Sequence, residues 1–460
     1  MGVEVVVLAA GKGTRMYSDL PKVLHPLAGK PMLSHVLDAA TALSADKVHL
    51  VTGFQSETIR EYYANTTYAQ QLNWIEQKEQ LGTGHAVMQA APSIADDSLV
   101  LVLYGDVPLI KTDTLKSLLL TAEETGIAVL TLVTPDPFGL GRIVRNQEGQ
   151  ITAIVEEKDA NAEQKAITEI NTGIMAFKAG HLKAWLQQLN TNNAQGEYYL
   201  TDTVAIAHSQ NQRIGSLQTR DPNEVQGVNN RLQLTELERA WQLANARELA
   251  LKGVTISDPA RIDVRGELIV GRDCSLDVNV IFEGNNTLGN RVSIGPNVVL
   301  VNCVIGDDTE ILANSHLENV VVRKGCHIGP FARLRPGTEL KDGAKIGNFV
   351  ETKKTIVGAG SKINHLSYVG DAELGESVNV GAGTITCNYD GVNKSRTTIK
   401  SGAFIGSNTA LVAPVTVGED STVGAGSVIT TDVPDRELAV ARGKQRNISG
   451  WKRPVKKQTN

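Results

Sequence analysis

The chain has 460 residues, of which 41% are hydrophobic and 21% are charged, and its formal net charge is -5 at pH 7. Because a single hydrophobic core stops growing at roughly 250 to 300 residues, this length predicts two or three domains. The mildly acidic balance argues against nucleic-acid binding, and the apolar run at residues 3–10 is too short for a membrane span and lacks a basic leader, which argues against a signal peptide and membrane insertion.

The first part of the chain, residues 1–229, alternates short apolar runs with amphipathic segments of helical length. Residues 3–10 and 48–53 have the pattern of strands, and residues 31–43 between them have the pattern of a helix. Strands that alternate with helices are joined by crossovers, which favours a mainly parallel sheet. This part of the chain is therefore predicted to be an α/β domain.

A glycine-rich turn, LAAGKGTRM at residues 8–16, directly follows the first strand. Glycines let backbone N–H groups approach an anion closely, and Lys12 and Arg15 add positive charge, so the turn is predicted to wrap a phosphate group. The spacing differs from a Walker loop, and Met16 stands where the dinucleotide motif has its last glycine, which disfavours a P-loop ATPase or a dehydrogenase. Taken alone, such a turn is as often a plain strand-to-helix connection.

Three later features strengthen the phosphate hypothesis. Lys22 adds another cation shortly after the turn, and QLGTGH at residues 80–85 forms a second small-residue turn that suits a base or a sugar. The apolar run at residues 99–103 predicts a buried strand, and Asp106 follows its end. Ligands bind at the carboxyl ends of parallel strands, where a carboxylate beside phosphates can hold Mg²⁺, although a helix cap would explain Asp106 alone equally well.

Residues 230–252 contain many helix formers and neither Gly nor Pro, which predicts one long connecting helix. Beyond Asp258 an aliphatic residue recurs at every sixth position, which predicts a β-helix whose hexapeptides form the faces of a triangular coil. The polar residues 386–398 interrupt the repeat with a loop, a common place for binding residues. The inward positions are Ile405, Leu411, Val417, Val423 and Ile429, and, in an earlier register that slips once, Ile328, Leu334, Leu340, Ile346, Thr352, Val357, Ile363 and Val369.

A second anion site is predicted on this solenoid. Three hexapeptides make one coil, so Arg335 and Lys353, eighteen residues apart in one unbroken register, are expected to stack about 4.8 Å apart. Stacked like charges are unfavourable unless an anion lies beside them, which indicates a phosphate site. His365 falls in the next coil, where a neutral imidazole can accept a proton from an attacking amine. Two solvated cations and a packed histidine are the alternatives for these features taken singly.

The four cysteines and the C-terminal tail bear on the compartment and on the end of the chain. Cys274, Cys303, Cys326 and Cys387 lie far apart, without a CxxC pair or a histidine at zinc-ligand spacing. This usage predicts reduced thiols in a cytoplasmic protein. The basic residues within 451–457 are few and terminal, and we interpret this tail as a solvated end.

Segments in order along nearly the whole chain carry a family resemblance: LAAGKGTRM, PKVLH, EQLGTGHA, LYGDVPL, GRIVR, EINTGI, NNAQGEYYLTD, GVNNRLQL and VGAGTITCNYDG. The chain resembles the bacterial bifunctional N-acetylglucosamine-1-phosphate uridyltransferase/glucosamine-1-phosphate acetyltransferases. The resemblance implies an α/β, Rossmann-like nucleotidyltransferase domain at 1–229, a linker helix at 230–252 and a left-handed parallel β-helix acetyltransferase domain at 253–460. It also implies a cytoplasmic homotrimer that makes UDP-N-acetylglucosamine from UTP, sugar phosphates and acetyl-CoA.

For the first reaction, the resemblance implies attack of a sugar phosphate oxygen on the α-phosphorus of UTP. Arg15 and Lys22 match catalytic cations, and Asp106 and Asn229 match Mg²⁺ ligands. These groups would position the phosphates and stabilise their charge rather than transfer protons. The positions that match contacts to UDP-N-acetylglucosamine are Leu8, Ala9, Ala10, Gly11, Lys22, Gln77, Gly82, Thr83, Tyr104, Gly105, Asp106, Gly141, Glu156, Asn171 and Asn229.

For the second reaction, the resemblance implies acetyl transfer from acetyl-CoA to the amine of glucosamine 1-phosphate. His365 matches the proton acceptor. The positions that match sugar phosphate contacts are Arg335, Lys353, Tyr368 and Asn379, and those that match acetyl-CoA contacts are Ala382, Asn388, Tyr389, Ser407, Ala425 and Arg442.

Two other functions remain open from the sequence. A nucleotidyltransferase whose β-helix only oligomerises or regulates would keep residues 11–15 and Asp106 but would give His365 no role. A non-enzymatic scaffold with both folds would fit the loss of loop cations or of the metal carboxylate, yet Lys12, Arg15, Lys22 and Asp106 are all present.

Overall fold

A computed structural model describes residues 1–456 of the chain, so Lys457 of the basic tail and residues 457–460 of the predicted β-helix domain lie outside the described residues. The chain divides into two compact units between Gln242 and Leu243. This division falls inside helix α9 (Arg231–Leu251), at the segment whose composition predicts a connecting helix.

A nine-stranded sheet forms the centre of the first unit, with the order β11-β7-β10-β6-β1-β4-β5 and a hairpin, β8–β9, beside β10. The pairs β6–β1, β1–β4, β4–β5 and β11–β7 are parallel, whereas β10 is antiparallel to both of its neighbours. The mainly parallel sheet is thus confirmed. The strands are β1 (Val3–Ala9), β4 (Lys47–Thr52), β5 (Leu72–Glu76), β6 (Leu99–Tyr104), β7 (Ile127–Val133), β8 (Arg142–Arg145), β9 (Ile151–Val155), β10 (Glu169–Lys178) and β11 (Gly215–Thr219).

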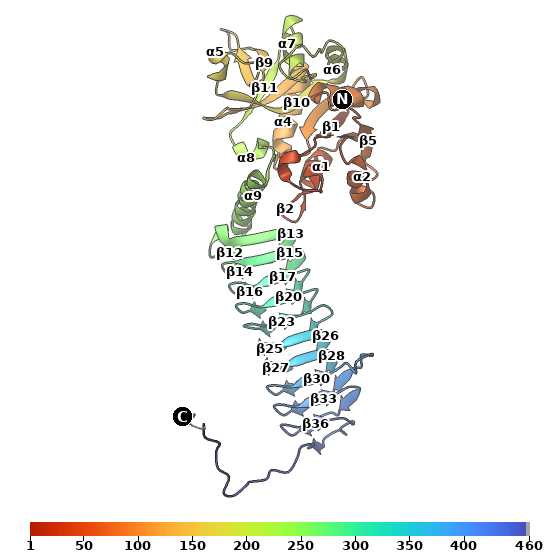
Figure 1. Ribbon diagram of the computed structural model, residues 1–460, viewed down its shortest axis with the longest axis vertical. Helices are drawn as coiled ribbons and strands as arrows, with labels where there is room; N and C mark the ends of the chain where they lie inside the picture. The colour runs from red at the N-terminus through yellow and green to blue at the C-terminus, as the bar shows by residue number, and fades with distance from the viewer. Residues whose placement is uncertain (457–460) are drawn as a thin grey trace. The chain divides into compact units, whose positions relative to one another are not determined.

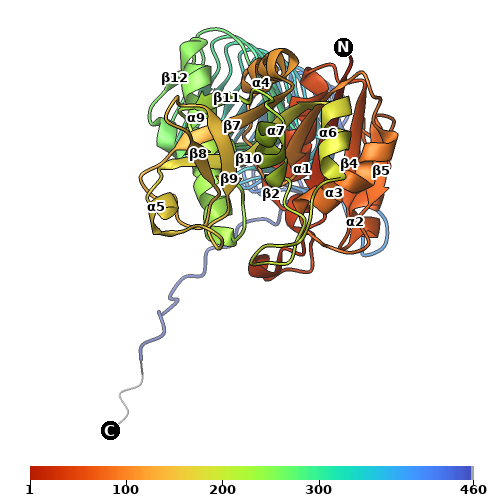
Figure 2. The ribbon, with the colours of Figure 1, turned by 90° about the horizontal axis from the view of Figure 1, so that it is seen from above.

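Helices cover both faces of this sheet, because its central strands are apolar on both sides. Val5 and Val7 of β1 belong to the core under α1, α2 and α4, while Val6 between them belongs to the core under α3, α6 and α7. Viewed from above, α2 and β5 lie at one edge of the unit and α5, β8 and β9 at the other (Figure 2). The helices are α1 (Met32–Ala42), α2 (Ser56–Tyr63), α3 (Thr83–Ala90), α4 (Thr112–Thr125), α5 (Ala162–Lys165), α6 (Ala179–Leu186), α7 (Asp202–Ser209) and α8 (Pro222–Val225).

The first turns of α9 pack against the segment that follows the glycine-rich turn. This segment contains two 3-10 turns, η1 (Thr14–Met16) and η2 (Lys22–Leu24), and a short hairpin of β2 (Pro26–Leu27) and β3 (Lys30–Pro31). Met16 and Leu27 form a small core with Leu237 of α9. Arg231 Nε donates to the carbonyl of Met16 over 3.2 Å, and Glu238 accepts the backbone N–H of Ala28 over 2.6 Å. The start of α9 therefore belongs to the first unit.

The second unit is a parallel β-helix whose strands stack coil upon coil (Figure 1). One 11-stranded ladder contains β14, β25, β27 and β29, and a 15-stranded ladder contains β23, β26, β28 and β30. This architecture confirms the fold predicted from the six-residue period.

The strands of the second unit are β12 (Thr255–Ile256), β13 (Ile262–Val270), β14 (Ser275–Leu276), β15 (Val280–Leu288), β16 (Ser293–Ile294), β17 (Val299–Val301), β18 (Val304–Ile305), β19 (Glu310–Ile311), β20 (His316–Glu318), β21 (Val321–Val322), β22 (His327–Ile328), β23 (Arg333–Leu334), β24 (Glu339–Leu340), β25 (Lys345–Asn348), β26 (Glu351–Val357), β27 (Lys362–His365), β28 (Tyr368–Leu374), β29 (Asn379–Val380), β30 (Ile385–Cys387), β31 (Thr397–Ile399), β32 (Phe404–Ile405), β33 (Ala410–Val412), β34 (Val415–Val417), β35 (Thr422–Val423), β36 (Val428–Ile429) and β37 (Leu438–Ala439). The isolated turn η3 (Ala91–Ser93) lies in the first unit and η4 (Pro259–Arg261) in the second.

The predicted inward positions line the interior of the coils. In the first register Ile405 and Leu411 are fully buried, and in the second even the polar Thr352 is. The slip of one residue has a structural cause, because Arg333 pairs with Glu351 but Glu351 pairs with Tyr368, so this coil is one residue shorter than the coil before it. The polar loop at 386–398 emerges between β30 and β31 as predicted, with an isolated bridge between Tyr389 and Lys394.

All four cysteines are free, and Cys274, Cys303 and Cys326 are buried. Burial raises the pKa of the Cys303 and Cys326 thiols to about 11. Among residues 1–456, none of the helices is both long and apolar enough to span a membrane.

Candidate active sites

A cavity of about 250 Å³ opens at the carboxyl ends of β1 and β6 in the first unit. These two strands are parallel neighbours with Leu8 opposite Tyr104, so the residues that follow them meet at one edge of the sheet, where α/β proteins bind ligands. Gln80, from the turn predicted to suit a base or a sugar, also lines the cavity. The lining residues predicted singly from the sequence are Leu8, Ala9, Ala10, Gly11, Lys22, Gln77, Gly82, Thr83, Tyr104 and Asp106, and those not predicted are Val23, Ala86 and Glu197.

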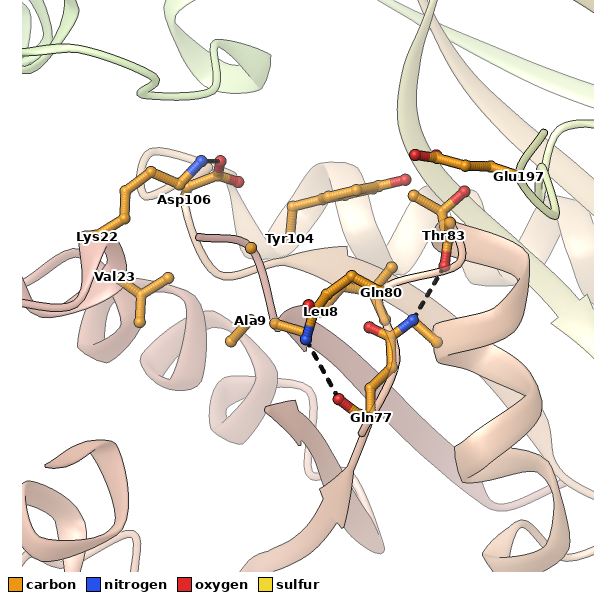
Figure 3. A pocket seen from close by; sticks show the side chains of 14 residues that line it. Leu8, Ala9, Lys22, Val23, Gln77, Gln80, Thr83, Tyr104, Asp106 and Glu197 are labelled. Carbon is orange, nitrogen blue, oxygen red and sulfur yellow. Dashed lines mark hydrogen bonds and ion pairs between the residues drawn. The ribbon is translucent and has the colours of Figure 1, made fainter. Parts of the chain in front are cut away.

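The polar groups of this cavity are divided between its two ends (Figure 3). Lys22 and Asp106 meet at one end, Thr83 and Glu197 lie at the other, and the Tyr104 ring lies between them. Burial, with the negative charges of Glu156 and Asp106, raises the pKa of Tyr104, so this phenol is a neutral hydrogen-bond donor.

Two oxygen donors converge on one cation position at the Lys22 end. The Lys22 ammonium forms an ion pair with Asp106 Oδ2 and lies 3.4 Å from Asn229 Oδ1. Both side chains of the ion pair are mostly buried, at 13% and 17% exposure. Carboxylate and amide oxygens suit a hard divalent cation, and with only two protein ligands the remaining positions would go to phosphates and water. Asp106 and Asn229 therefore fit a divalent metal.

Gly82 shapes the middle of the cavity wall. Its φ of 104° is open to glycine alone, and a Cβ there would lie 2.6 Å from the carbonyl oxygen of Tyr198. The turn thus brings α3 and the segment at 197–200 together, with the Thr83 hydroxyl accepting the backbone N–H of Leu200 over 3.2 Å. This close approach is what places Glu197 opposite Thr83.

A second group of predicted residues gathers around Tyr104. A Cβ on Gly173 would lie 2.7 Å from the Tyr104 ring, and Asn171 Oδ1 accepts the backbone N–H of Gly173 over 3.1 Å. Asn171 in turn donates its backbone N–H to the carbonyl of Gly141 over 2.8 Å. Glu156 Oε1 accepts the Thr201 hydroxyl over 3.1 Å, and burial raises the pKa of its carboxyl group. Gly141, Glu156 and Asn171 therefore flank the Tyr104 side of the cavity.

The glycine-rich turn passes over Lys22. Gly13 has a φ of 58°, and a Cβ there would lie 2.7 Å from Lys22 Cβ. Lys12 and Arg15 are exposed, and neither lines the cavity. The structure therefore brings Lys22, but not Arg15, to the cavity wall. Gly105 lies between Tyr104 and Asp106, and its backbone N–H donates to the carbonyl of Leu8 over 2.9 Å.

The second candidate site lies on the outer surface of the β-helix. Arg335 donates its backbone N–H to the carbonyl of Thr352 over 2.9 Å, which places Lys353 in the next coil beside it. Arg335 Nη1 also donates to Glu351 Oε1 over 2.7 Å. The Lys394 ammonium lies beside Lys353 and, with the charge of Arg335, lowers the pKa of Lys353. Arg335, Lys353 and Lys394 thus form a cluster of cations, in which Arg335 pairs with Glu351 and the charge of Asp371 acts on Lys353.

Lys394 and Glu351 are members of this cluster that the sequence analysis did not identify. Lys394 comes from the polar loop, which is tied to the coil by Asn388 Nδ2 donating to Asp371 over 2.5 Å and by an Arg396–Glu373 ion pair of 2.6 Å. The loop was predicted to carry binding residues, but no sequence period links it to Lys353, so its contact could not be read from spacing.

His365 is exposed at the end of β27, one turn before Tyr368 begins β28. Its Nδ1 lies 2.9 Å from Asn348 Oδ1 in the preceding coil. Tyr368 pairs in register with Glu351, which connects the histidine turn to the cation cluster. An imidazole, a phenol and a cluster of cations therefore share one corner of the solenoid.

Three predicted acetyl-CoA residues continue the column that begins at His365. The backbone N–H after Ala382 donates to the His365 carbonyl over 3.3 Å, and equivalent bonds of 2.8 Å link Ala382 to the turn after Ser407 and Ser407 to the turn after Ala425. Arg442 Nη1 donates to the Ala425 carbonyl over 2.7 Å. Successive coils are about 4.8 Å apart, so the column offers a long track that ends at the imidazole.

Asn379 lies apart from the cation cluster, whereas Tyr389 forms an isolated backbone bridge with Lys394 of that cluster. Asn379 pairs with Lys362, at the opposite end of the β27 face from His365, about 10 Å away by strand rise. Tyr389 is exposed in the polar loop, and its hydroxyl donates to the carbonyl of Gly391 over 2.6 Å.

Comparison with known proteins adds an independent result. Residues 5–191 match the family model of the MobA-like NTP transferase domain, and residues 396–431 match the model of the bacterial transferase hexapeptide with six repeats. The bifunctional protein GlmU of Marinobacter nauticus is 59% identical over 454 residues, which cover 99% of each chain. A crystal structure of UDP-glucose pyrophosphorylase complexed with UDP-glucose matches 52% of this chain and 98% of its own, with a TM-score of 0.45 and 16% identity.

Proposed function

Since the chain belongs to the family of bifunctional GlmU proteins, we propose that its two candidate sites divide the two reactions of this family between them. The enzyme transfers the acetyl group of acetyl-CoA to glucosamine 1-phosphate, and it transfers the uridylyl group of UTP to N-acetylglucosamine 1-phosphate with release of pyrophosphate. The cavity of the first unit performs uridylyl transfer, and the His365 corner of the β-helix performs acetyl transfer. The sequence-derived boundaries at 229 and 252 stand as the proposed limits of the two catalytic domains.

One observation supports the first assignment above all: two oxygen donors converge on a cation position beside the cavity. The family requires a divalent metal, and we assign Mg²⁺ to Asp106 and Asn229 because both supply hard oxygen ligands. When bound, Mg²⁺ neutralises phosphate charge and fixes the geometry of the α-phosphate.

The residues of the chain then position the two substrates. Leu8 to Gly11, Gln77, Gly82 and Thr83 hold the uridine nucleotide along the cavity wall. The sugar binds on the Tyr104 side, beside Gly141, Glu156 and Asn171, with Gly105 at the floor. Lys22 stabilises negative charge as the sugar phosphate oxygen attacks the α-phosphorus and the bond to pyrophosphate breaks. Arg15 acts from the exposed turn on the outer phosphates.

Acetyl transfer uses groups of the protein alone. Arg335 and Lys353 bind the phosphate of glucosamine 1-phosphate, and Tyr368 and Asn379 contact the sugar. His365 accepts a proton as the amine nitrogen attacks the thioester carbonyl. The C–S bond then breaks, the acetyl group stays on nitrogen, and the coenzyme A thiolate takes the proton from the imidazolium. Acetyl-CoA lies along the column of Ala382, Ser407, Ala425 and Arg442, with Asn388 and Tyr389 of the polar loop beside it.

A mixing experiment tests this division of labour. Asp106→Ala and His365→Ala chains are each supplied with glucosamine 1-phosphate, acetyl-CoA, UTP and Mg²⁺, and UDP-N-acetylglucosamine is measured. Each chain alone should fail, whereas the mixture should form product because the acetylated intermediate can diffuse between chains. Product from either chain alone, or none from the mixture, would contradict the assignment.

We further propose a cytoplasmic homotrimer. Four free cysteines support a reducing compartment. Phe331, Phe349 and Leu366 are 48%, 54% and 64% exposed, and the two phenyl rings stack 5.2 Å apart. Such an apolar stripe on a β-helix suits contact with further copies of the chain. Sedimentation of the full chain should give three times its mass, and Phe349→Asn should shift the assembly toward smaller species; a monomer at micromolar concentration would refute the trimer.

A further inference from the structure

We propose that Asn348 is a positioning residue for acetyl transfer, because it holds His365 in the one tautomer whose Nε2 can accept the proton of the attacking amine. This inference rests on the proposed role of His365 as the proton acceptor. It assigns to Asn348 no contact with either substrate.

The hydrogen bond between the two side chains sets the tautomer. His365 Nδ1 lies 2.9 Å from Asn348 Oδ1. An amide oxygen can only accept, so Nδ1 must carry the ring proton and Nε2 is left with its lone pair. The bond also fixes the orientation of the ring, so Nε2 points in one direction from the surface of the solenoid.

The coil geometry makes this contact specific. The two residues are seventeen positions apart and pair in register between β25 and β27. In a coil of eighteen residues His365 would instead lie opposite Gly347, which has no side chain to offer. The shortened coil between Glu351 and Tyr368 is therefore what aligns an amide with the imidazole.

The backbone around the pair is held firmly. Leu366 donates its N–H to the Asn348 carbonyl over 3.1 Å, and the Ser367 hydroxyl donates to the His365 carbonyl over 2.8 Å. Phe349 and Leu366, the residues after each partner, have left-handed φ values of 57° and 46°. Asn297, Asn314 and Phe331, at the corresponding corners of earlier coils, also have positive φ values, so this conformation is a regular feature of the solenoid corner and holds the backbone of the pair in place.

A neutral partner suits the reaction better than a charged one. During acetyl transfer the imidazole must first accept a proton and then release it to the thiolate. A carboxylate at Nδ1 would also orient the ring, but it would stabilise the imidazolium and oppose the release. An amide orients the ring without adding negative charge. Asn348 therefore orients the His365 ring without slowing the release of the proton from the imidazolium.

The test compares three substitutions in the full chain by thiol release from acetyl-CoA. Asn348→Ala should lower kcat about tenfold or more with nearly unchanged KM values, since loss of a tautomer-fixing carboxylate can cost roughly 10⁴ in a buried triad and an exposed amide should cost less. Asn348→Asp should recover much of this rate while the rising limb of the pH profile moves to higher pH. Asn314→Ala is the matched control, because it removes the 3.2 Å amide bond from Asn297 in an earlier coil.

The tautomer is read directly by nitrogen-15 NMR of chains labelled at their nine histidines, with the His365 signals assigned from their loss in His365→Ala. The wild-type ring should show a protonated Nδ1 and a bare Nε2, and Asn348→Ala should shift the signals toward a mixture. A protonated Nε2 in the wild type, or an Asn348→Ala chain with unchanged rate and spectrum, would overturn the proposal.

Failure of the underlying function gives a different result. If His365→Ala keeps full acetyl transfer, the proton-acceptor role itself is wrong. If His365→Ala is inactive but Asn348→Ala behaves as the wild type, only the positioning role is wrong. In both cases uridylyl transfer by the same preparation reports whether the chain is folded.

Discussion

Phosphate binding is proposed for both sites, but the two sites obtain positive charge in different ways. The cavity of the first unit holds a single lysine, Lys22, whose charge is already compensated by Asp106. The β-helix site gathers Arg335, Lys353 and Lys394 on the outside of the coils, beside Glu351 and Asp371. In the proposed function the first site needs a divalent metal, whereas the second has its own cations, two on stacked coils and one on the polar loop. A triphosphate can bring a metal ion with it, while a sugar monophosphate must rely on the side chains of the protein.

This difference predicts that loss of the metal lowers uridylyl transfer and leaves acetyl transfer nearly unchanged. Asp106→Asn should reduce uridylyl transfer by about 10³-fold or more, because the α-phosphate loses both its metal and the alignment that the metal provides. Acetyl transfer by the same chain should stay within a factor of two. Pyrophosphate release and thiol release on one preparation measure both. Chelation of divalent metal with an excess of EDTA should likewise lower uridylyl transfer and spare acetyl transfer. Normal uridylyl transfer by the chelated enzyme would contradict the proposed role of the metal.

A substitution of His365 tests the β-helix site in the same way. His365→Ala should lower acetyl transfer by about 10² to 10⁴, the usual range for loss of a general base, and should leave uridylyl transfer intact. His327→Ala is a suitable control, since His327 is a half-buried histidine of the same solenoid that pairs with Glu310 over 2.8 Å. Equal losses in the two variants would show that the effect is structural.

The crowding of cations in the β-helix site predicts a pH dependence. Phosphate binds the charged form of Lys353, so binding weakens as pH rises through its pKa, and the neighbouring Lys394 lowers that pKa. Lys394→Met should raise the KM for glucosamine 1-phosphate about tenfold near neutral pH, as expected for one lost charge-assisted bond. It should also move the alkaline rise in KM to higher pH.

KM measured from neutral to alkaline pH tests both effects. Lys400→Met is the control, because Lys400 pairs with Asp435 over 3.1 Å elsewhere on the solenoid. An alkaline limb that stays in place, or moves to lower pH, would mean that Lys394 does not act on Lys353.

The smallest expected effects come from two glycines in similar left-handed turns. A Cβ on Gly13 would lie 2.7 Å from Lys22, whereas a Cβ on Gly325 would meet nothing within 4 Å. Gly13→Ala should displace Lys22 and lower uridylyl transfer about tenfold, in keeping with the sensitivity of catalysis to small misplacements. Gly325→Ala should cost about 1 kcal/mol of stability and change neither rate. Thermal unfolding measures the stability, and the two activity assays measure the rates. Unchanged uridylyl transfer in Gly13→Ala would show that the turn can shift without displacing Lys22.

Much of the architecture could be predicted from the sequence, because it depends on local pattern. The alternation of strands and helices, the phosphate turn and the six-residue period are properties of short segments. The period even predicts the stacking of Arg335 on Lys353, since a regular coil converts sequence distance into position. Family motifs supplied the remaining site residues, and ten of them line the first cavity.

The sequence by itself therefore determined the two folds and the residue types available at each site. Only the tertiary structure decided which side chains meet. Glu197 faces Thr83 because two distant turns pack together at Gly82. Lys394 lies beside Lys353 because an irregular loop folds back on its coil. His365 lies opposite Asn348 and not opposite Gly347, because this coil is one residue shorter than the coil before it. The short coil is visible in the sequence as the slip of the aliphatic register after Thr352, but the loop contacts follow from loop paths, which long-range packing sets, and no local period encodes them.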